Sequence, residues 1–119
     1  MCHVLIVEDE PLIALDLESL LSDQGATSFS FAASEAEAVS EAFDRRPDLI
    51  TSDVTLLEGT GPSAVRAIRT ALGLIPVIYV SALAVGHIDD DVHTRALQKP
   101  LDRSALITAF RELKPANFG

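Results

Sequence analysis

The stretch Leu49-Ile50-Thr51-Ser52-Asp53-Val54-Thr55 decides how this chain folds. It is a short run that begins with apolar residues and leads to one carboxylate, Asp53. A run of this kind is typical of a strand that is buried on both faces of a parallel sheet. We therefore predict a central strand over residues 49–53, with Asp53 at its carboxyl end.

Three other apolar runs also end in polar residues. Val4-Leu5-Ile6-Val7 precedes Glu8-Asp9-Glu10, Val77-Ile78-Tyr79-Val80 precedes Ser81, and Ala96-Leu97-Gln98 precedes Lys99-Pro100. Ligands of open α/β sheets bind at the carboxyl ends of the strands, so these polar groups indicate one site at that edge.

The composition is that of a folded acidic domain. The chain has 119 residues, 48% of them hydrophobic, and a single domain over residues 1–119 is expected, with no output domain. The net charge of −9 argues against nucleic-acid binding and against adhesion to an anionic membrane, because both rely on Lys and Arg. Cys2 is the only cysteine, which excludes an internal disulfide and suits a reducing compartment, so a cytoplasmic location is expected.

Helical patterns separate the predicted strands. Helices are predicted to begin at Pro11, after a Ser34–Glu37 capping box, at Gly61-Pro62 and after Asp102. Their predicted buried faces are Ile13, Leu17, Leu20 and Leu21; Ala36, Val39 and Phe43; Val65, Ile68 and Leu72; and Leu106, Ala109, Phe110 and Leu113. Residues 82–94 show no helical stripe, so a loop or one short helical turn is expected there.

The alternation of strands and helices predicts an α/β fold. Residues 26–32 alternate phenylalanine with serine, which indicates a half-exposed strand near a sheet edge. A strand followed by a helix recurs five times, with one degraded helix, and this order implies a parallel sheet with helices on both faces.

Taken together, the strand ends resemble the receiver domain of two-component response regulators. The matching residues are Glu8-Asp9, Asp53, Ser81 and Lys99-Pro100, each at the end of a strand, and the resemblance covers the whole chain. It implies a doubly wound, flavodoxin-like fold with strand order 2-1-3-4-5, and with the fourth helix shortened or replaced by a loop. It also implies a cis peptide bond at Lys99-Pro100.

The chemistry of these residue types agrees with the resemblance. An aspartate can attack a phosphoryl group and form an acyl phosphate, but its own charge repels that group unless a cation is present. Mg²⁺ suits this place because it prefers a few carboxylates together with waters and phosphate oxygens. A lysine offers the phosphoryl oxygens a positive charge, and a serine offers them a hydroxyl donor.

The resemblance implies a role for each residue. Asp53 would accept the phosphoryl group, with Lys99 and Ser81 in contact with it. The Mg²⁺ ligands would be Asp9 directly, Glu8 through a water, Asp53, and the backbone carbonyl of Thr55. The expected phosphodonor is a sensor histidine kinase, and the domain, a monomer or weak dimer, would act by binding a downstream protein or as a phosphate sink.

Two departures from the family pattern concern how a signal would leave the site. The position three residues before Lys99 is usually Phe or Tyr but here is Ala96, and the usual proline four residues after the phosphoacceptor is Leu57. The ordinary aromatic switch is therefore in doubt. The expected signalling positions are Tyr79, Ala96 and Pro100, together with the loop between Ser81 and Thr94.

These departures resemble the atypical alphaproteobacterial single-domain receivers that carry a Phe-Ala-Thr-Gly-type motif after the fourth strand. Tyr79-Val80-Ser81-Ala82 stands in that place here, and it keeps the aromatic character and the hydroxyl of the motif. The ending Leu97-Gln98-Lys99-Pro100 resembles them as well.

Two other functions remain open from the sequence. Ala96 and Leu57 favour a receiver-like scaffold that binds partners without phosphorylation, whereas the retained Asp53 and Lys99 argue against it. A flavodoxin-like redox protein fits the strand pattern, but the three carboxylates of Glu8-Asp9-Glu10 would repel a flavin phosphate. Each residue taken alone also suits a helix end, a turn or the surface, and the complete set in order favours the receiver.

Overall fold

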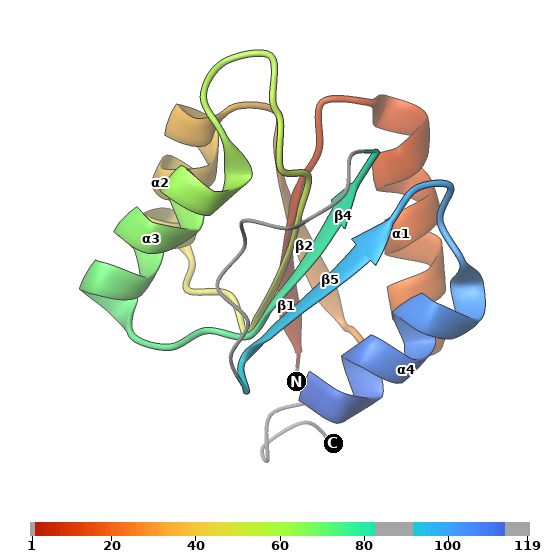
Figure 1. Cartoon of the computed structure of the whole chain (residues 1–119). Helices are drawn as coiled ribbons and strands as arrows, with labels where there is room; N and C mark the ends of the chain where they lie inside the picture. Colours follow the sequence, from red (N-terminus) through yellow and green to blue (C-terminus); the bar gives the residue numbers. More distant parts are fainter. Residues whose placement is uncertain (1, 83–91, 114–119) are drawn as a thin grey trace.

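A single parallel sheet organises the computed structural model, which describes residues 2–82 and 92–113. Its strands are β1 (His3–Val7), β2 (Ser28–Ala32), β3 (Leu49–Ser52), β4 (Val77–Ser81) and β5 (Thr94–Gln98), and its helices are α1 (Pro11–Asp23), α2 (Glu35–Asp44), α3 (Gly61–Leu72) and α4 (Arg103–Leu113). The strand order is β2-β1-β3-β4-β5, so the predicted doubly wound fold is confirmed (Figure 1). The loop or short turn predicted over residues 82–94, in place of a full fourth helix, lies mostly in 83–91, outside the described residues, and Thr94 at its end belongs to β5.

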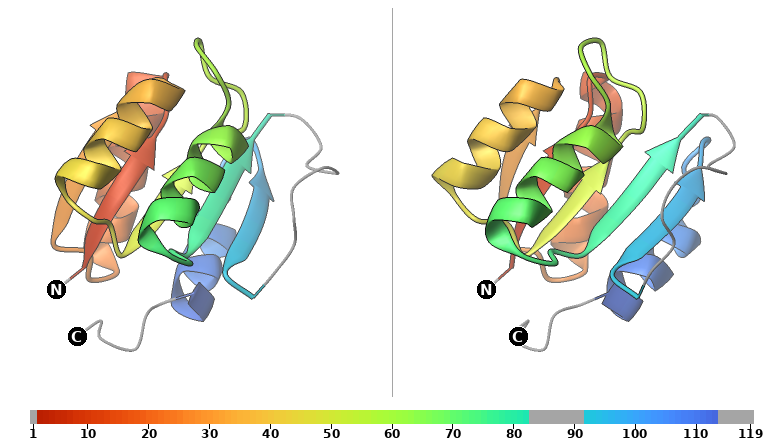
Figure 2. Two further views of the ribbon diagram at one scale, coloured as in Figure 1. Left: turned by 90° about the vertical axis from the view of Figure 1, so that its left-hand side faces the viewer. Right: turned by 60° about the vertical axis from the view of Figure 1, so that its left-hand side comes forward.

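The described helices cover both faces of the sheet. Figure 2 shows α2 and α3 together in front of one face, with α1 and α4 behind the other. The core under α1 and α4 includes Val4, Ile6, Leu49, Ile78, Leu21, Leu106 and Phe110. The core under α2 and α3 includes Leu5, Val7, Ile50, Val77, Tyr79, Ala38 and Ile68. Successive strand residues thus enter opposite cores, which is why the central strands are apolar without interruption.

The start of α2 was predicted correctly, but its buried face was predicted only in part, because Val39 packs against the core whereas Ala36 and Phe43 are exposed. Ser34 Oγ accepts from the N–H of Glu37 at 3.2 Å, while the carboxylate of Glu37 accepts from the N–H of Ala33 at 2.7 Å. Phe43 is 55% exposed, whereas Ala38 and Ala42 are buried. Spacing alone could not distinguish the two stripes, because each has the i, i+4 periodicity of a helix.

The other helix ends follow their local sequence signals. Thr60 Oγ1 accepts from the N–H of Ser63 at 3.2 Å, and Asp102 Oδ1 accepts from the N–H of Ala105 at 3.2 Å. α3 ends at Gly73, whose φ of 99° is a left-handed value that favours glycine. No helix in the described ranges is both long and apolar enough to cross a membrane.

Candidate functional site

The predicted site residues lie at one edge of the sheet, where the strands end. Glu8 follows β1, Asp53 follows β3, Ser81 ends β4, and Lys99 comes directly after β5. The N–H of Asp53 donates to the carbonyl oxygen of Val7 at 2.9 Å, and the N–H of Lys99 donates to that of Ser81 at 2.7 Å. Backbone pairing of the parallel strands therefore holds these positions together.

The ammonium of Lys99 joins two buried carboxylates. Its Nζ donates to Oδ2 of Asp53 at 3.0 Å and forms a longer ion pair, at 3.4 Å, with Oε1 of Glu8. Burial lowers the pKa of Lys99, but the hydrogen bond to Asp53 and the charge of Glu8 outweigh burial and raise it overall. Lys99 therefore stays a cation at the centre of the site.

Glu8 is a carboxylate with little compensation for its charge. Its side chain is 1% exposed, and burial raises its pKa from 4.5 to about 7, against opposing contributions from the N–H of Glu10 and from Lys99. Oε2 accepts from the N–H of Glu10 at 3.2 Å. Oε1 has no hydrogen-bond partner among the described residues, because the contact with Lys99 is an ion pair only. A bound cation would give this buried oxygen the partner that it lacks.

Three carboxylates gather in the loop after β1. One oxygen each of Glu8, Asp9 and Glu10 lies within 4.8 Å of the others. Glu8 is buried, Asp9 is half-buried and Glu10 is exposed. Glu10 had no predicted role as a ligand, although its place beside Glu8 and Asp9 in the sequence was a signal for one. Oxygens of this type, so close together, fit Mg²⁺.

The loop after β3 approaches the same edge. The N–H of Thr55 points to Oδ1 of Asp53 at 3.4 Å. Gly61, at the start of α3, packs so tightly that a Cβ there would overlap the carbonyl oxygen of Asp53 and Oγ of Ser52. The sequence predicted Gly61 only as a helix start, since nothing local shows what a glycine packs against.

The predicted signalling positions have different surroundings. Tyr79 is buried in the core under α2 and α3, and it pairs in register with Ala96, which is exposed on the edge strand β5. The Lys99-Pro100 peptide bond is cis, as predicted. Leu57, in the loop after β3, is 84% exposed.

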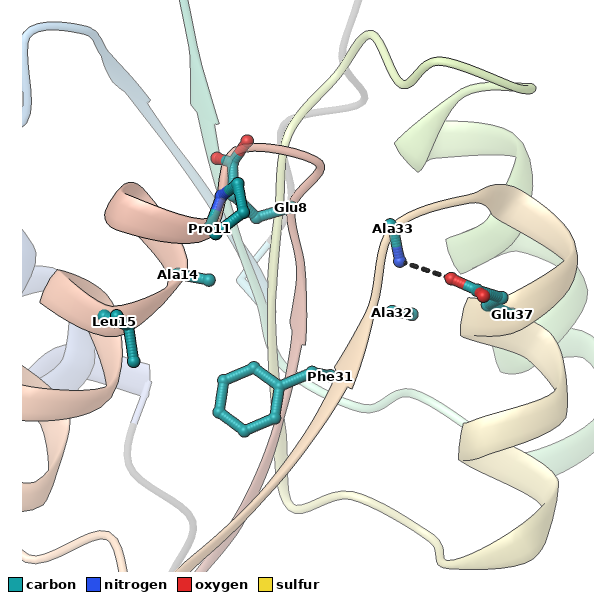
Figure 3. A pocket seen from close by; sticks show the side chains of 8 residues that line it. All are labelled: Glu8, Pro11, Ala14, Leu15, Phe31, Ala32, Ala33 and Glu37. Carbon is teal, nitrogen blue, oxygen red and sulfur yellow. Dashed lines mark hydrogen bonds between the residues drawn. The ribbon is translucent and has the colours of Figure 1, made fainter.

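An apolar pocket of about 450 Å³ adjoins the acidic site (Figure 3). Glu8 lines it at one end, and Figure 3 shows Leu15 of α1 and Phe31 of β2 on its two sides. Leu15 is 57% exposed and Phe31 is 45% exposed, and Leu12 nearby on α1 is 81% exposed. The pocket was not predicted, although Leu12 and Leu15 lie outside the buried stripe of α1.

Comparisons with known proteins agree with this architecture. A family model described as the response regulator receiver domain matches residues 4–111. The phyllosphere-induced regulator PhyR of Methylorubrum extorquens is 40% identical over 83 residues, which cover 67% of this chain and 30% of that protein. The chain spans less than two thirds of the length of the curated relatives it matches.

Solved structures are similar over nearly the whole chain. The solution structure of the PhyR receiver domain from Erythrobacter litoralis has a TM-score of 0.82 and 30% identity, covering 98% of this chain and 92% of that one. The receiver domain of the sensor histidine kinase PA1611 from Pseudomonas aeruginosa PAO1 has a TM-score of 0.77 and 26% identity, covering 96% of this chain and 98% of that one. That structure has a magnesium ion coordinated in its active-site cleft.

Proposed function

Because the chain belongs to the response regulator receiver domain family, we propose that Asp53 accepts a phosphoryl group from a phosphohistidine of a sensor histidine kinase. The observation that carries this proposal is the position of Lys99. Its Nζ lies 3.0 Å from Oδ2 of Asp53 and 3.4 Å from Oε1 of Glu8. A cation held between two carboxylates at the carboxyl edge of a parallel sheet suits an aspartate that receives an anion.

The residues present fit a magnesium ion. The buried Oε1 of Glu8 lacks a hydrogen-bond partner among the described residues, and the carboxylates of Glu8, Asp9 and Glu10 converge. We propose that Glu8, Asp9, Asp53 and the carbonyl of Thr55 hold it, either directly or through water. When bound, Mg²⁺ offsets the repulsion between the acceptor carboxylate and the phosphoryl oxygens.

The proposed transfer is a displacement at phosphorus. An oxygen of Asp53 attacks the phosphorus atom, and a P–O bond forms as the P–N bond to the histidine breaks. The electron pair of that bond stays on the ring nitrogen, and the ring leaves as neutral imidazole because its other nitrogen carries a proton. Lys99 then transfers its hydrogen bond from the carboxylate to a phosphoryl oxygen, and the hydroxyl of Ser81 donates to another. Later attack by water releases inorganic phosphate and restores the carboxylate.

The kinase must reach this edge, and the apolar pocket offers the contact surface. The pocket begins at Glu8 and is flanked by the exposed side chains of Leu15 and Phe31. Exposed apolar side chains grouped in this way mark a surface that a protein partner covers. We propose that the phosphohistidine-bearing part of the kinase docks here, so that its ring is presented to Asp53. Once phosphorylated, the domain would act by binding a partner or as a phosphate sink.

The test follows labelled phosphate from a phosphorylated kinase to this protein. Wild type should take up label when Mg²⁺ is present, and should take up none when the ion is chelated. Asp53→Asn should take up none in either case, since its amide is no nucleophile for this step. Labelling of Asp53→Asn at the wild-type rate would show that the acceptor has been assigned wrongly.

A scaffold that works without phosphorylation is the second candidate. The exposed Ala96 favours it, because the position lacks the aromatic side chain that would change its orientation when the site is phosphorylated. Beryllofluoride, a phosphate mimic, separates the two candidates. A receiver that uses Asp53 should bind it only with Mg²⁺ present, whereas a scaffold should show no Mg²⁺-dependent change.

A further inference from the structure

The loop between β3 and α3 carries two of the groups in the proposed site. Asp53 opens it, and Thr55 follows two residues later. Within the loop, Thr55 forms an isolated antiparallel bridge with Thr60, and the N–H of Leu56 donates to the carbonyl of Gly59 at 3.4 Å. Leu56 is buried in the core under α2 and α3, but Thr55 and all of residues 57–60 are exposed, so packing supports the loop mainly at Leu56.

One side chain from another element holds this loop. Oε1 of Glu35, the first residue of α2, accepts from the N–H of Thr60 at 3.0 Å. Oε2 of Glu35 accepts from Oγ of Ser63 at 2.9 Å. The backbone N–H of Glu35 donates to the carbonyl of Glu58 at 3.1 Å. Three hydrogen bonds from a single residue therefore join the start of α2 to the loop and to the first turn of α3.

Two further features show that this contact is closely fitted. Gly59 has a φ of 81°, and a Cβ there would overlap the side chain of Glu35. The hydrogen bonds from Thr60 and Ser63 hold the pKa of Glu35 below its ordinary value. The carboxylate is therefore charged, and it lies at the N-terminus of α3, where a negative charge is favourable.

We propose that Glu35 is a positioning residue for the phosphorylation site, because it fixes the loop that carries Asp53 and Thr55. The link runs from Glu35 to Thr60, across the bridge from Thr60 to Thr55, and from the N–H of Thr55 to Asp53. The inference rests on the proposed function, since it assumes that the carbonyl of Thr55 is a Mg²⁺ ligand. Glu35 itself is neither one of the proposed Mg²⁺ ligands nor one of the groups proposed to contact the phosphoryl group.

The test compares three variants of the full chain. Glu35→Ala removes the side-chain bond to Thr60 in the loop and the one to Ser63 in α3, while Glu35→Gln keeps an oxygen for the N–H of Thr60 and an amide that can donate to Ser63. Ser34→Ala removes the cap of the same helix without touching the loop, so it reports a loss of α2 stability alone.

The first measurement is Mg²⁺ binding by calorimetry. Glu35→Ala should raise the dissociation constant roughly tenfold, as the loss of a group that orients metal ligands does. Glu35→Gln and Ser34→Ala should stay within about twofold of wild type. With acetyl phosphate as donor, Glu35→Ala should need more Mg²⁺ for half-maximal labelling, yet reach the wild-type rate at saturation.

The second measurement is amide hydrogen exchange without Mg²⁺. The N–H groups of Leu56 and Thr60 should exchange faster in Glu35→Ala than in Ser34→Ala at matched global stability. Unchanged Mg²⁺ affinity in Glu35→Ala, or an equal loss in Ser34→Ala, would overturn the positioning role and leave the proposed function intact. Wild type that binds no Mg²⁺ would instead overturn the proposed function, and the inference with it.

Discussion

Lys99 and Asp53, which lie 46 positions apart in the sequence, meet through a hydrogen bond of 3.0 Å between Nζ and Oδ2. The contact exists because β3, β4 and β5 run parallel, so that the ends of all three strands reach the same edge. The lysine side chain is 14% exposed and that of Asp53 is 10% exposed. Because this charged pair is well shielded from water, replacing one of its members should change both phosphorylation and stability.

Replacing Lys99 should impair phosphorylation more than it impairs folding. Lys99→Met keeps an unbranched side chain but removes the charge, so labelling by acetyl phosphate should slow on the order of a hundredfold. The unfolding free energy should fall by about 1–3 kcal/mol, because two buried carboxylates lose their partner. Lys99→Arg keeps the charge in a different shape and should lose less activity. If Lys99→Met is labelled at the wild-type rate, the proposed role of the lysine is contradicted.

Gly61 is expected to be essential to the site through its lack of a side chain. In Gly61→Ala the new methyl group would collide with the carbonyl oxygen of Asp53, so the strand end must shift. We expect a loss of about 1–3 kcal/mol in unfolding free energy, as overpacking causes, together with a loss of labelling. Urea denaturation and acetyl phosphate labelling measure the two effects.

Gly25→Ala is the matched control for this variant. Gly25 has a φ of 112° with open space around it, so alanine there is strained by its backbone conformation only. It should reduce stability without changing the labelling rate of the folded protein. Equal loss of labelling in the two variants would mean that global stability, rather than the contact with Asp53, explains the effect.

If the apolar pocket is the docking surface, a substitution in it should slow phosphoryl transfer from a protein donor but not from a small-molecule donor. Phe31→Ser should slow transfer from the kinase roughly tenfold or more, because an exposed aromatic at an interface contributes strongly to binding. Labelling by acetyl phosphate should not change, since that donor needs no docking surface. Phe43→Ser is the control, because Phe43 is 55% exposed on α2 and does not line the pocket. Equal effects of both substitutions on kinase transfer would exclude this pocket as the docking surface.

His3 predicts how stability depends on pH. Its ring nitrogens contact Oγ of Ser28 at 2.9 Å and Oγ of Ser30 at 2.8 Å. Burial, followed by the nearby charge of Arg45, lowers the pKa of His3 below 6.5, against a smaller opposing effect of Asp48. The folded protein therefore favours the neutral ring. The contribution of the neutral ring to the unfolding free energy is present above about pH 6.5 and is lost as pH falls through the lowered pKa.

His3→Gln should remove this dependence. Urea unfolding at several values between pH 5 and pH 8 should show wild type losing stability, relative to His3→Gln, as pH falls. A single proton limits that difference to about 1.4 kcal/mol per pH unit. A stability difference between the two proteins that stays constant over the whole range would contradict the prediction.

Local sequence was sufficient wherever the fold depends on local physical chemistry. Continuous apolar runs identified β1 and β3, Asp102 marked the start of α4, and alternation marked β2 as an edge strand. It failed in part at α2, because the buried stripe of Ala38 and Ala42 and the predicted stripe ending in the exposed Phe43 have the same period. Which of two equivalent stripes is buried depends on the surfaces that the helix packs against.

By itself, the sequence determined the α/β class, the strand order that the receiver resemblance implies, and the residues placed at the strand ends. The class and the strand-end residues follow from patterns within single segments, since a buried strand must be apolar and a helix end needs a cap, whereas the strand order is implied by the resemblance alone. Only the tertiary structure decided that Lys99 joins Glu8 to Asp53, that Glu35 holds the loop after β3, and that a pocket opens beside Glu8. Such contacts join residues 25 or more positions apart, and no local pattern records them until packing brings the segments together.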